Sequence, residues 1–532
     1  GGRAQWRPPA GAGLELEAFQ AAFWEMLDAV HRRWGQALSV PGRVLRPGGE
    51  LRKDYNFGKP PRALGEGSFG KVFLAKDKKT GLLRAVKEMQ TSTEEAPDVL
   101  DSEVGRLCLL DHPNIVKLYS CYRHGELVWI VMDYCSGGSL KTCITHLRSK
   151  RRLMAEATVA STVRQLLLAV AHVHARGLLH LDIKPDNVLM MPELGTLPPS
   201  SGPDPETTAS GIPDLSKPIH LMLIDLGLSR AFRPGDFKGN SPRGTPLTMA
   251  PEVWRGIETP AADIFSCGCT FFYLTAQAYP FRGLPQDTRS QDMRNWWAAC
   301  PARFENEHAG SYSLECQALC DRMLHRKRLR RPSAPQCLRD AFLAPGRCAE
   351  ASEPQVCQRL QRLAKAPDRS VLYRSVALAV AAAWPAHRLP TTRSAFERLD
   401  VAGTGRLHRS QIQEALVSLG VEEELARNAA DAADLSRNGM VDWTEFVAAC
   451  VHLSSDALKE DLWQLFQEAD RDHDGLLDRK DLSKLLATRH ARREDVDNVM
   501  LDLVGSTDAK VDWPTFRRHF KSIAADREEA LP

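Results

Sequence analysis

The segment His180–Asn187, with the sequence His-Leu-Asp-Ile-Lys-Pro-Asp-Asn, constrains this chain more than any other. It sets an acid, Asp182, a base, Lys184, and an amide, Asn187, at short fixed offsets behind an apolar segment. Phosphoryl transfer requires an oriented nucleophile and neutralised phosphate charge more than covalent chemistry by the protein. Asp182 can accept the proton of a hydroxyl group, Lys184 can lie beside the moving phosphoryl group, and Asn187 can bind a metal. An octapeptide of this kind can also be a chance loop, so its interpretation depends on the flanking segments.

Length and composition bound the class of the chain. Its 532 residues are too many for a single core and suggest about three domains. The net charge of +3 is nearly balanced, which argues against a nucleic-acid partner. No apolar run reaches the roughly 18 residues of a membrane-spanning helix, and the 13 cysteines have the pattern of reduced, intracellular thiols. We expect a cytoplasmic monomer and leave peripheral membrane association open.

A glycine-rich stretch precedes the octapeptide by about a hundred residues. Gly65, Gly67 and Gly70 lie in Leu-Gly-Glu-Gly-Ser-Phe-Gly-Lys-Val, and glycine lets backbone approach the phosphates of a nucleotide. The chain continues as a strand instead of a helix, and a second strand follows with Lys87. A hairpin over phosphates followed by Ala-Val-Lys is the arrangement of protein kinases. Lys87 needs a carboxylate partner, and Glu103 on a predicted helix is the candidate.

Further segments complete a nucleotide site in the expected order. Strand 127–133 leads to a hinge beside the adenine, and Asp225 of Asp-Leu-Gly follows strand 219–224 as a second metal ligand. Thr245 and the segment Ala-Pro-Glu252 come next, and Arg331 is the expected buried partner of Glu252. The residues predicted to contact ATP are Leu64, Gly65, Glu66, Gly67, Ser68, Phe69, Gly70, Lys71, Val72, Ala85, Lys87, Glu103, Asp133 and Cys135. Those predicted to act in catalysis are Asp182, Lys184, Asn187 and Thr245, and those predicted to bind Mg²⁺ are Asn187 and Asp225.

In this order and spacing, residues 55–344 resemble a eukaryotic protein kinase domain, interrupted by a surface insert at 192–218. Lys184 and Thr245 resemble the Ser/Thr branch. Leu181 stands where most such kinases have the arginine that binds a phosphorylated activation loop, so activation by that route is not expected. None of the departures removes a catalytic part, and the resemblance therefore implies an active enzyme.

The second half of the chain repeats a metal-binding pattern. Loops begin at Asp400, Asp434, Asp470 and Val504, which are 34, 36 and 34 residues apart. A twelve-residue calcium loop needs oxygen donors at positions 1, 3, 5, 9 and 12, a carbonyl at 7 and glycine at 6. The second and third loops fit, with the ligands Asp434, Ser436, Asn438, Met440, Asp442 and Glu445, and Asp470, Asp472, Asp474, Leu476, Asp478 and Asp481.

The other two loops lack essential donors. Ala402 and Gln411 occupy positions 3 and 12 of the first loop, and Val504 and Thr515 occupy positions 1 and 12 of the fourth. We expect the first and fourth loops to be free of metal. In the third loop, Asp481 replaces the usual glutamate, which predicts weaker calcium binding and more tolerance of magnesium.

The kinase-like part, a basic and apolar junction and four such loops resemble the calcium-dependent protein kinases that contain their own calmodulin-like domain. The resemblance implies an α+β chain in which a bilobal kinase fold precedes an all-α domain of four EF-hands. It also implies ATP, Mg²⁺ and Ca²⁺ as cofactors, proteins with Ser/Thr as substrates, and a junction that inhibits the kinase until calcium binds. The expected divisions are an N-terminal extension with an amphipathic helix (1–54), the kinase domain (55–344), the junction (345–390), the EF-hand domain (391–520) and a tail (521–532).

Three alternatives remain open from the residues alone. The chain can be a calcium-sensing scaffold whose kinase fold transfers nothing, or an active kinase whose hands are structural and filled with magnesium. A calcium buffer explains least, because it leaves the kinase segments without a role. The junction can equally be a connecting helix or an inhibitory segment.

Overall fold

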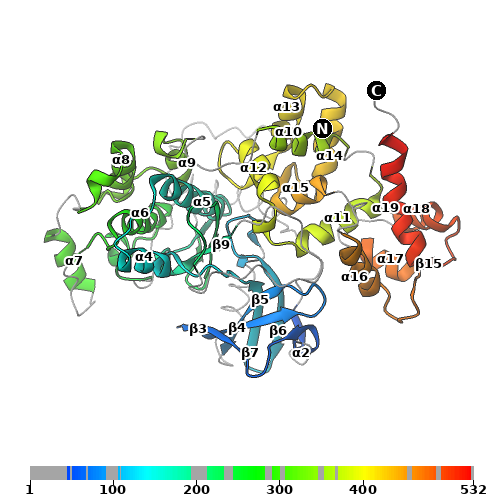
Figure 1. Cartoon of the computed structure of the whole chain (residues 1–532), viewed down its shortest axis with the longest axis horizontal. Helices are drawn as coiled ribbons and strands as arrows, with labels where there is room; N and C mark the ends of the chain where they lie inside the picture. The colour runs from blue at the N-terminus through cyan, green and yellow to red at the C-terminus, as the bar shows by residue number, and fades with distance from the viewer. Residues whose placement is uncertain are drawn as a thin grey trace, which may run out of the picture.

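The computed structural model of the chain shows two lobes of a kinase-like part followed by two pairs of helix–loop–helix units (Figure 1). It is an α+β structure. The residues that it describes are 45–47, 51–67, 70–90, 106–107, 109–192, 212–232, 244–281, 290–299, 306–344, 353–365, 369–451, 458–486 and 493–528. The predicted helix at 14–38, Glu103 and most of the 192–218 insert lie outside this set.

The N-lobe is a seven-stranded sheet with the strand order β1-β6-β7-β5-β4-β2, in which β3 pairs with β4. The predicted hairpin is formed by β4 and β5, with Val72 opposite Lys87. The described elements of this lobe are β1 (Leu45–Pro47), α2 (Leu51–Asp54), β2 (Tyr55–Asn56), β3 (Ala63–Gly67), β4 (Gly70–Asp77), β5 (Leu83–Gln90), β6 (Leu118–His124) and β7 (Leu127–Asp133).

The C-lobe is helical and is built around α5, whose residues are apolar on nearly every side and therefore buried. Pro260 begins α6, where its missing N–H costs no hydrogen bond. The helices are α4 (Leu140–Ser149), α5 (Glu156–Ala175), α6 (Pro260–Ala276), α7 (Ser290–Ala299), α8 (Leu314–Met323) and α9 (Ala334–Leu338). Short strand pairs join β9 (Val188–Pro192) to β10 (Ile219–Leu223) and β8 (Leu178–Leu179) to β11 (Arg230–Ala231), so the insert is the connection between β9 and β10.

The hand domain pairs its loops through short antiparallel strands, β12 with β13 and β14 with β15. Its helices are α12 (Pro390–Leu399), α13 (Arg409–Ser418), α14 (Glu423–Ala433), α15 (Trp443–Cys450), α16 (Lys459–Ala469), α17 (Arg479–Leu486), α18 (Arg493–Val504) and α19 (Trp513–Glu528). The strands between them are β12 (Arg406–His408), β13 (Met440–Asp442), β14 (Leu476–Leu477) and β15 (Val511–Asp512). Within the described residues, no helix combines the length and apolar composition that crossing a bilayer requires.

The junction is part of the hand domain's core. It forms α10 (Glu353–Gln361) and α11 (Val371–Ala383), and α11 runs between the two hand pairs in Figure 1. Leu360 and Val376 are buried in the same apolar cluster as Phe446 and Phe466. Each buried aliphatic side chain of this size contributes about 1.5–3 kcal/mol, so the hands hold the junction firmly. The structure therefore packs the junction helices against the EF-hand helices.

Candidate active site

The octapeptide forms a tight cluster of hydrogen bonds around Asp182. Thr245 Oγ1 donates to Asp182 Oδ1 at 2.7 Å, and Lys184 Nζ donates to Asp182 Oδ2 at 2.7 Å. Lys184 Nζ also reaches Thr245 Oγ1 at 2.9 Å. Asn187 Nδ2 donates to the main-chain oxygen and to Oδ2 of Asp182 at 2.9 and 3.0 Å. The four residues predicted to act in catalysis are thus brought into direct contact.

Asp263 fixes the shape of this loop from a helix 82 residues away. Its carboxylate accepts hydrogen bonds from the backbone N–H of His180 (2.9 Å) and Leu181 (2.8 Å) and pairs with His174 Nε2 at 2.8 Å. Burial raises the pKa of Asp263, but the hydrogen bonds from His174 and His180 outweigh burial and lower it. Leu181 has a φ of +65°, which a side chain rarely adopts without such support. The fully buried Asp263 therefore holds the backbone that presents Asp182.

The nucleotide-binding strands bring Lys87 to Asp225. Lys87 Nζ lies 3.4 Å from Asp225 Oδ1, so the two charges predicted to contact the phosphates and the metal converge. Gly70 has a φ of +130°, and a Cβ there would collide with the carbonyl of Glu88. The sheet places the remaining predicted ATP contacts on three strands: Leu64, Gly65, Glu66 and Gly67 on β3, Gly70, Lys71 and Val72 on β4, and Ala85 and Lys87 on β5. Ser68, Phe69 and Glu103 lie outside the described residues.

The two predicted Mg²⁺ ligands are linked through the backbone. Ile224 N donates to Asn187 O at 3.0 Å, which brings Asp225 beside the octapeptide. Because the Asn187 amide nitrogen is engaged with Asp182, its oxygen is the atom left to face a cation. A carboxylate and an amide oxygen are ligands that suit Mg²⁺. The residues present thus fit a magnesium ion, which when bound neutralises phosphate charge.

The carboxylate of Asp133, at the end of β7, anchors the hinge through hydrogen bonds. Asp133 Oδ2 accepts the backbone N–H of Lys117 at 3.0 Å, and Oδ1 accepts the hydroxyl of Tyr119 at 2.6 Å. Arg84 Nη1 lies 3.7 Å from the same Oδ1. The side chain of Asp133 therefore points away from the adenine position, and only its main chain can meet the base. Cys135 follows the hinge strand, and burial raises the pKa of its thiol.

The segment after Asp225 is anchored by the predicted ion pair. Arg331 Nη2 donates to Glu252 Oε2 at 2.8 Å and Nη1 to Oε1 at 2.5 Å, which confirms the pairing expected from the sequence. Gly244 has a φ of +110°, and a Cβ there would collide with the carbonyl of Leu181. This packing, with no arginine at position 181, brings Thr245 to Asp182.

Two predicted ligands of the second loop, Asp434 and Glu445, shape it by accepting backbone hydrogen bonds. Asp434 accepts the backbone N–H groups of Asn438 (3.1 Å) and Gly439 (2.7 Å). The fully buried Glu445 accepts those of Ser436 (2.9 Å) and Asp442 (3.0 Å). The Asn438 side chain accepts the N–H of Met440, the position-7 residue of β13. These carboxylates close a loop whose oxygen donors suit calcium.

The third loop gathers three carboxylates. One oxygen from each of Asp470, Asp472 and Asp474 lies within 4.8 Å of the others, a spacing that a single cation can satisfy. Asp481 Oδ2 accepts the N–H of Asp478 at 3.2 Å, and Asp478 accepts the N–H of Asp481 in return. Burial and then the charge of Asp478 raise the pKa of Asp481. Leu476, on β14, offers the position-7 carbonyl. The donor set fits calcium.

The first loop lies against the kinase-like part. The carbonyl of Thr404 accepts a hydrogen bond from His172 Nδ1 of α5 at 2.8 Å. Gly405 has a φ of +67°, and a Cβ there would collide with the rings of His172 and His112. Burial lowers the pKa of both histidines, that of His112 to about 3, so both rings are neutral at physiological pH. This loop serves as a contact between domains.

The second loop also contacts the kinase-like part, where Arg176, Asp111 and Thr444 are residues to which the sequence assigned no role. Arg176 Nη2, at the end of α5, donates to Asp442 Oδ1 at 2.8 Å. Asp111 accepts both the N–H and the hydroxyl of Thr444, each at 2.8 Å. Neither contact leaves a local sequence signal, because the partners are 266 and 333 residues apart. Asp263 leaves no local signal for the same reason, since it lies 82 residues from Leu181.

Comparisons with known proteins agree with this geometry. Residues 59–343 match the protein kinase domain family. The chain is 28% identical over 470 residues to calcium-dependent protein kinase 9 of Oryza sativa subsp. japonica, covering 87% of this chain and 76% of that protein. It is 26% identical over 485 residues to calcium-dependent protein kinase 14 of Arabidopsis thaliana, covering 89% and 84%.

A longer relative gives the same result over a smaller share of its length. The chain is 24% identical over 496 residues to calcium-dependent protein kinase 6 of Plasmodium berghei, covering 91% of this chain and 31% of that protein. These matches run through the hands as well as the kinase domain. The chain therefore belongs to the protein kinase family, and most of its length is related to the calcium-dependent protein kinases.

Proposed function

We propose that this protein is a calcium-regulated serine/threonine kinase that transfers the γ-phosphate of ATP to protein hydroxyl groups. The observation that supports this best is the cluster at Asp182, whose carboxylate contacts Lys184, Asn187 and Thr245 at once. The Lys87–Asp225 pair lies on the other side of Asn187. A protein that only bound nucleotide would not need the first cluster.

Each residue has a distinct task in this proposal. Asp182 receives the hydrogen bond of the substrate hydroxyl and accepts its proton as the hydroxyl oxygen bonds to the γ-phosphorus. The bond from that phosphorus to the oxygen shared with the β-phosphate breaks, and ADP leaves with that oxygen. Lys184 lies on the same carboxylate and stabilises negative charge that moves onto the transferred group. Thr245 orients Asp182 through a hydrogen bond to its other oxygen. Lys87 contacts the phosphates, and Asn187 and Asp225 would hold the metal.

Calcium regulation is supported by where the junction lies. Its helices are packed among the hands, and Leu360 and Val376 are buried there. This is the arrangement expected when the hands have captured the junction. Inhibition then requires a second arrangement, in which α10 and α11 leave the hands, and calcium favours capture because it binds that state more tightly.

The end of the junction helix α11 contacts the back of the hinge. Arg84 Nη2 donates to Ala383 O at 3.1 Å, and Lys117 Nζ donates to Ala381 O at 3.2 Å. Cations are favoured at a helix C-terminus, where the carbonyls lack partners. Arg84 also lies 3.5 Å over the ring of Tyr119, and Tyr119 bonds Asp133 of the hinge. Capture of the junction thus stabilises the strands that position adenine.

Replacing Arg84 by Met should therefore raise the KM for ATP at saturating calcium by at least about threefold, which is a coupling of roughly 0.7 kcal/mol. The KM for a peptide substrate should change less, since the hinge contacts only the nucleotide. Initial rates over a range of ATP concentrations measure this. Arg123→Met removes the same charge from the exposed end of β6 and should leave both constants unchanged. Equal effects of the two substitutions would contradict the coupling.

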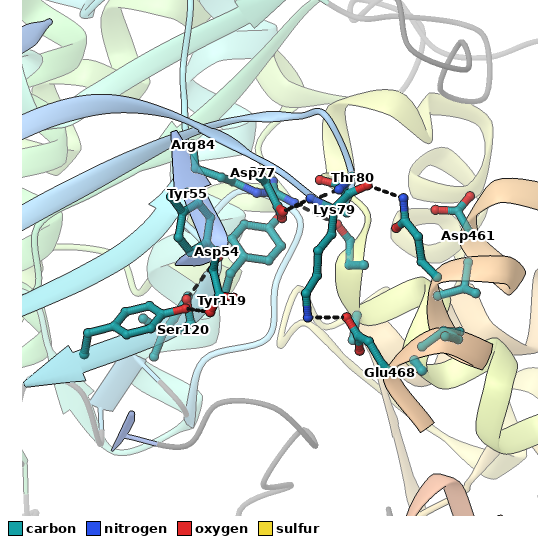
Figure 2. A pocket seen from close by; sticks show the side chains of 18 residues that line it. Asp54, Tyr55, Asp77, Lys79, Thr80, Arg84, Tyr119, Ser120, Asp461 and Glu468 are labelled. Atoms are coloured by element: carbon teal, nitrogen blue, oxygen red, sulfur yellow. Dashed lines mark hydrogen bonds and ion pairs between the residues drawn. The ribbon is translucent and has the colours of Figure 1, made fainter. Parts of the chain in front are cut away.

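A second contact lies between the N-lobe and the third hand. Lys79, in the β4–β5 turn, pairs with Glu468 Oε1 of α16 at 2.8 Å, and Gln464 donates to the carbonyl of Lys79 (Figure 2). A cavity of about 200 Å³ separates the sheet from α11 and α16 here, away from Asp182. Asp470 begins the third loop immediately after α16. Movement of α16 on calcium binding would reach the nucleotide-binding hairpin through Lys79.

The test is a kinase assay on the full chain with ATP-Mg and a Ser/Thr peptide, in chelator and in micromolar calcium. We expect transfer that rises with calcium. Transfer that is equal at all calcium levels would favour permanently filled, structural hands. Absence of transfer at any level, with nucleotide still bound, would favour the scaffold.

A further inference from the structure

The two loops predicted to be free of metal share a feature that ligand chemistry does not explain. Each has a basic residue at its seventh position: Arg406 in the first loop and Lys510 in the fourth. In a calcium loop this position supplies only a main-chain carbonyl, so its side chain is unconstrained. Antiparallel strand pairs put each residue beside the working partner loop, since β12 pairs with β13 and β14 with β15.

In the C-terminal pair, Lys510 reaches into the third loop. Its ammonium group forms an ion pair with Asp474 and lies 3.9 Å from Asp472 Oδ2. These are positions 3 and 5 of the loop, and with Asp470 they form the carboxylate cluster described above. The positive charge of Lys510 therefore lies against two of the three carboxylates that would hold a cation.

In the N-terminal pair, Arg406 also contacts a predicted ligand of the partner loop, at a different loop position. Its Nε donates to Asp442 Oδ1 at 2.8 Å, and Asp442 is position 9 of that loop. Arg409, also from the first loop, lies 3.7 Å from Asp434 Oδ2, position 1. Arg176 donates to the same oxygen of Asp442 at 2.8 Å. Asp442 is almost fully buried, so these charges act with little solvent screening.

We infer that Arg406 and Lys510 are built-in competitors of calcium, by which each metal-free loop sets the calcium affinity of its working partner. This inference rests on the proposed calcium regulation. A basic side chain that is already paired with a ligand carboxylate must be displaced, or tolerated close to a divalent cation, and both cost free energy. Without calcium, the same side chain relieves repulsion among the carboxylates. It therefore stabilises the metal-free state and weakens binding.

Chance surface pairing is the simpler explanation, and two observations argue against it. The basic residue stands at the same loop position in both pairs, and its partner in each case is a predicted calcium ligand. The two pairs also differ in a way that predicts different strengths. The Lys510 side chain is 42% exposed, whereas Asp442 is 2% exposed and meets two guanidinium groups. Arg406 should therefore affect affinity more than Lys510.

The experiment is a calorimetric titration of the full chain with calcium chloride. Lys510→Met should lower the Kd of one site by about threefold, the size expected for an exposed ion pair. Arg406→Gln should lower the Kd of the other site by more, on the order of tenfold, because its partner is buried. Lys510→Arg should match the wild type. Lys459→Met is the control. It removes the same charge from the start of α16, about 15 Å along that helix from the third loop.

Two further measurements separate this effect from a structural one. In chelator, Lys510→Met should lower the Tm of the hand domain, because the carboxylates then repel one another, even though the variant binds calcium more tightly. In 1 M KCl the difference in Kd should shrink, since salt screens an exposed pair. Unchanged Kd values in both charge-removing variants would overturn the inference and leave calcium regulation intact. A wild-type chain that takes up no calcium would overturn the proposed function itself.

Discussion

Asp182→Asn should reduce the rate of phosphoryl transfer by about 10²- to 10⁴-fold, the contribution of a positioned general base. The amide keeps the shape of the side chain but cannot accept the hydroxyl proton. Its single oxygen can accept on one side only, from Thr245 or from Lys184 and Asn187, but the support of the loop backbone by Asp263 remains, so the loop should stay folded. Steady-state kcat with a saturating peptide in calcium measures the loss.

The control for this variant is nucleotide affinity. Among the described residues no hydrogen bond or ion pair joins Asp182 to Lys87 or Asp225, so the Kd for ATP-Mg should change by less than about twofold. Thermal unfolding should remain close to the wild type. A variant that retains a tenth or more of the wild-type kcat would show that Asp182 is not the base.

Glu445→Gln should raise the calcium concentration for half-maximal activity by at least about tenfold. Glu445 is the twelfth residue of the second loop, and an amide is a far weaker bidentate ligand for a hard cation than a carboxylate. The amide also replaces one of the oxygens that now accept the N–H groups of Ser436 and Asp442. Activity across a calcium-buffer series measures the shift.

Gln411→Glu is the matched control at the same position of the first loop. The structure shows why a carboxylate there should not create a site. Gln411 Nε2 donates to the carbonyl of Leu399 at 2.9 Å, and a glutamate would lose that bond and face the carbonyl oxygen. Ala402 still offers no side-chain oxygen at position 3, and Arg406 still donates to Asp442 of the second loop. A shift as large as that of Glu445→Gln would show that the assignment of working and metal-free loops is wrong.

Contacts that are local in sequence were the ones that the sequence could predict. The strand at 127–133 is β7, with the same ends, and the strand at 219–224 is β10 within one residue at its end. Asp182, Lys184 and Asn187 lie close together in the sequence, so their clustering could be predicted from their spacing. Burial and alternation of side chains specify such elements directly.

Contacts between distant segments were not predictable in this way. The support of Leu181 by Asp263 and of Thr404 by His172 joins residues 82 and 232 positions apart. The sequence showed only that the first loop lacks calcium ligands. Missing ligands give no information about which residues the backbone of the loop contacts. The junction could be a connector or an inhibitor from its residues alone. Its place among the hands depends on the complementary shapes of two separate segments.

The packing of Gly405 against His172 has a consequence for how the molecule can move. The first hand is fastened to α5 by backbone that tolerates no added carbon atom and by a hydrogen bond whose histidine is neutral at physiological pH. In the calcium-regulated kinase proposed above, that hand would stay with α5, and any displacement driven by calcium would fall on the third and fourth hands. There α16 contacts Lys79, in the turn between β4 and β5 that leads to Lys87.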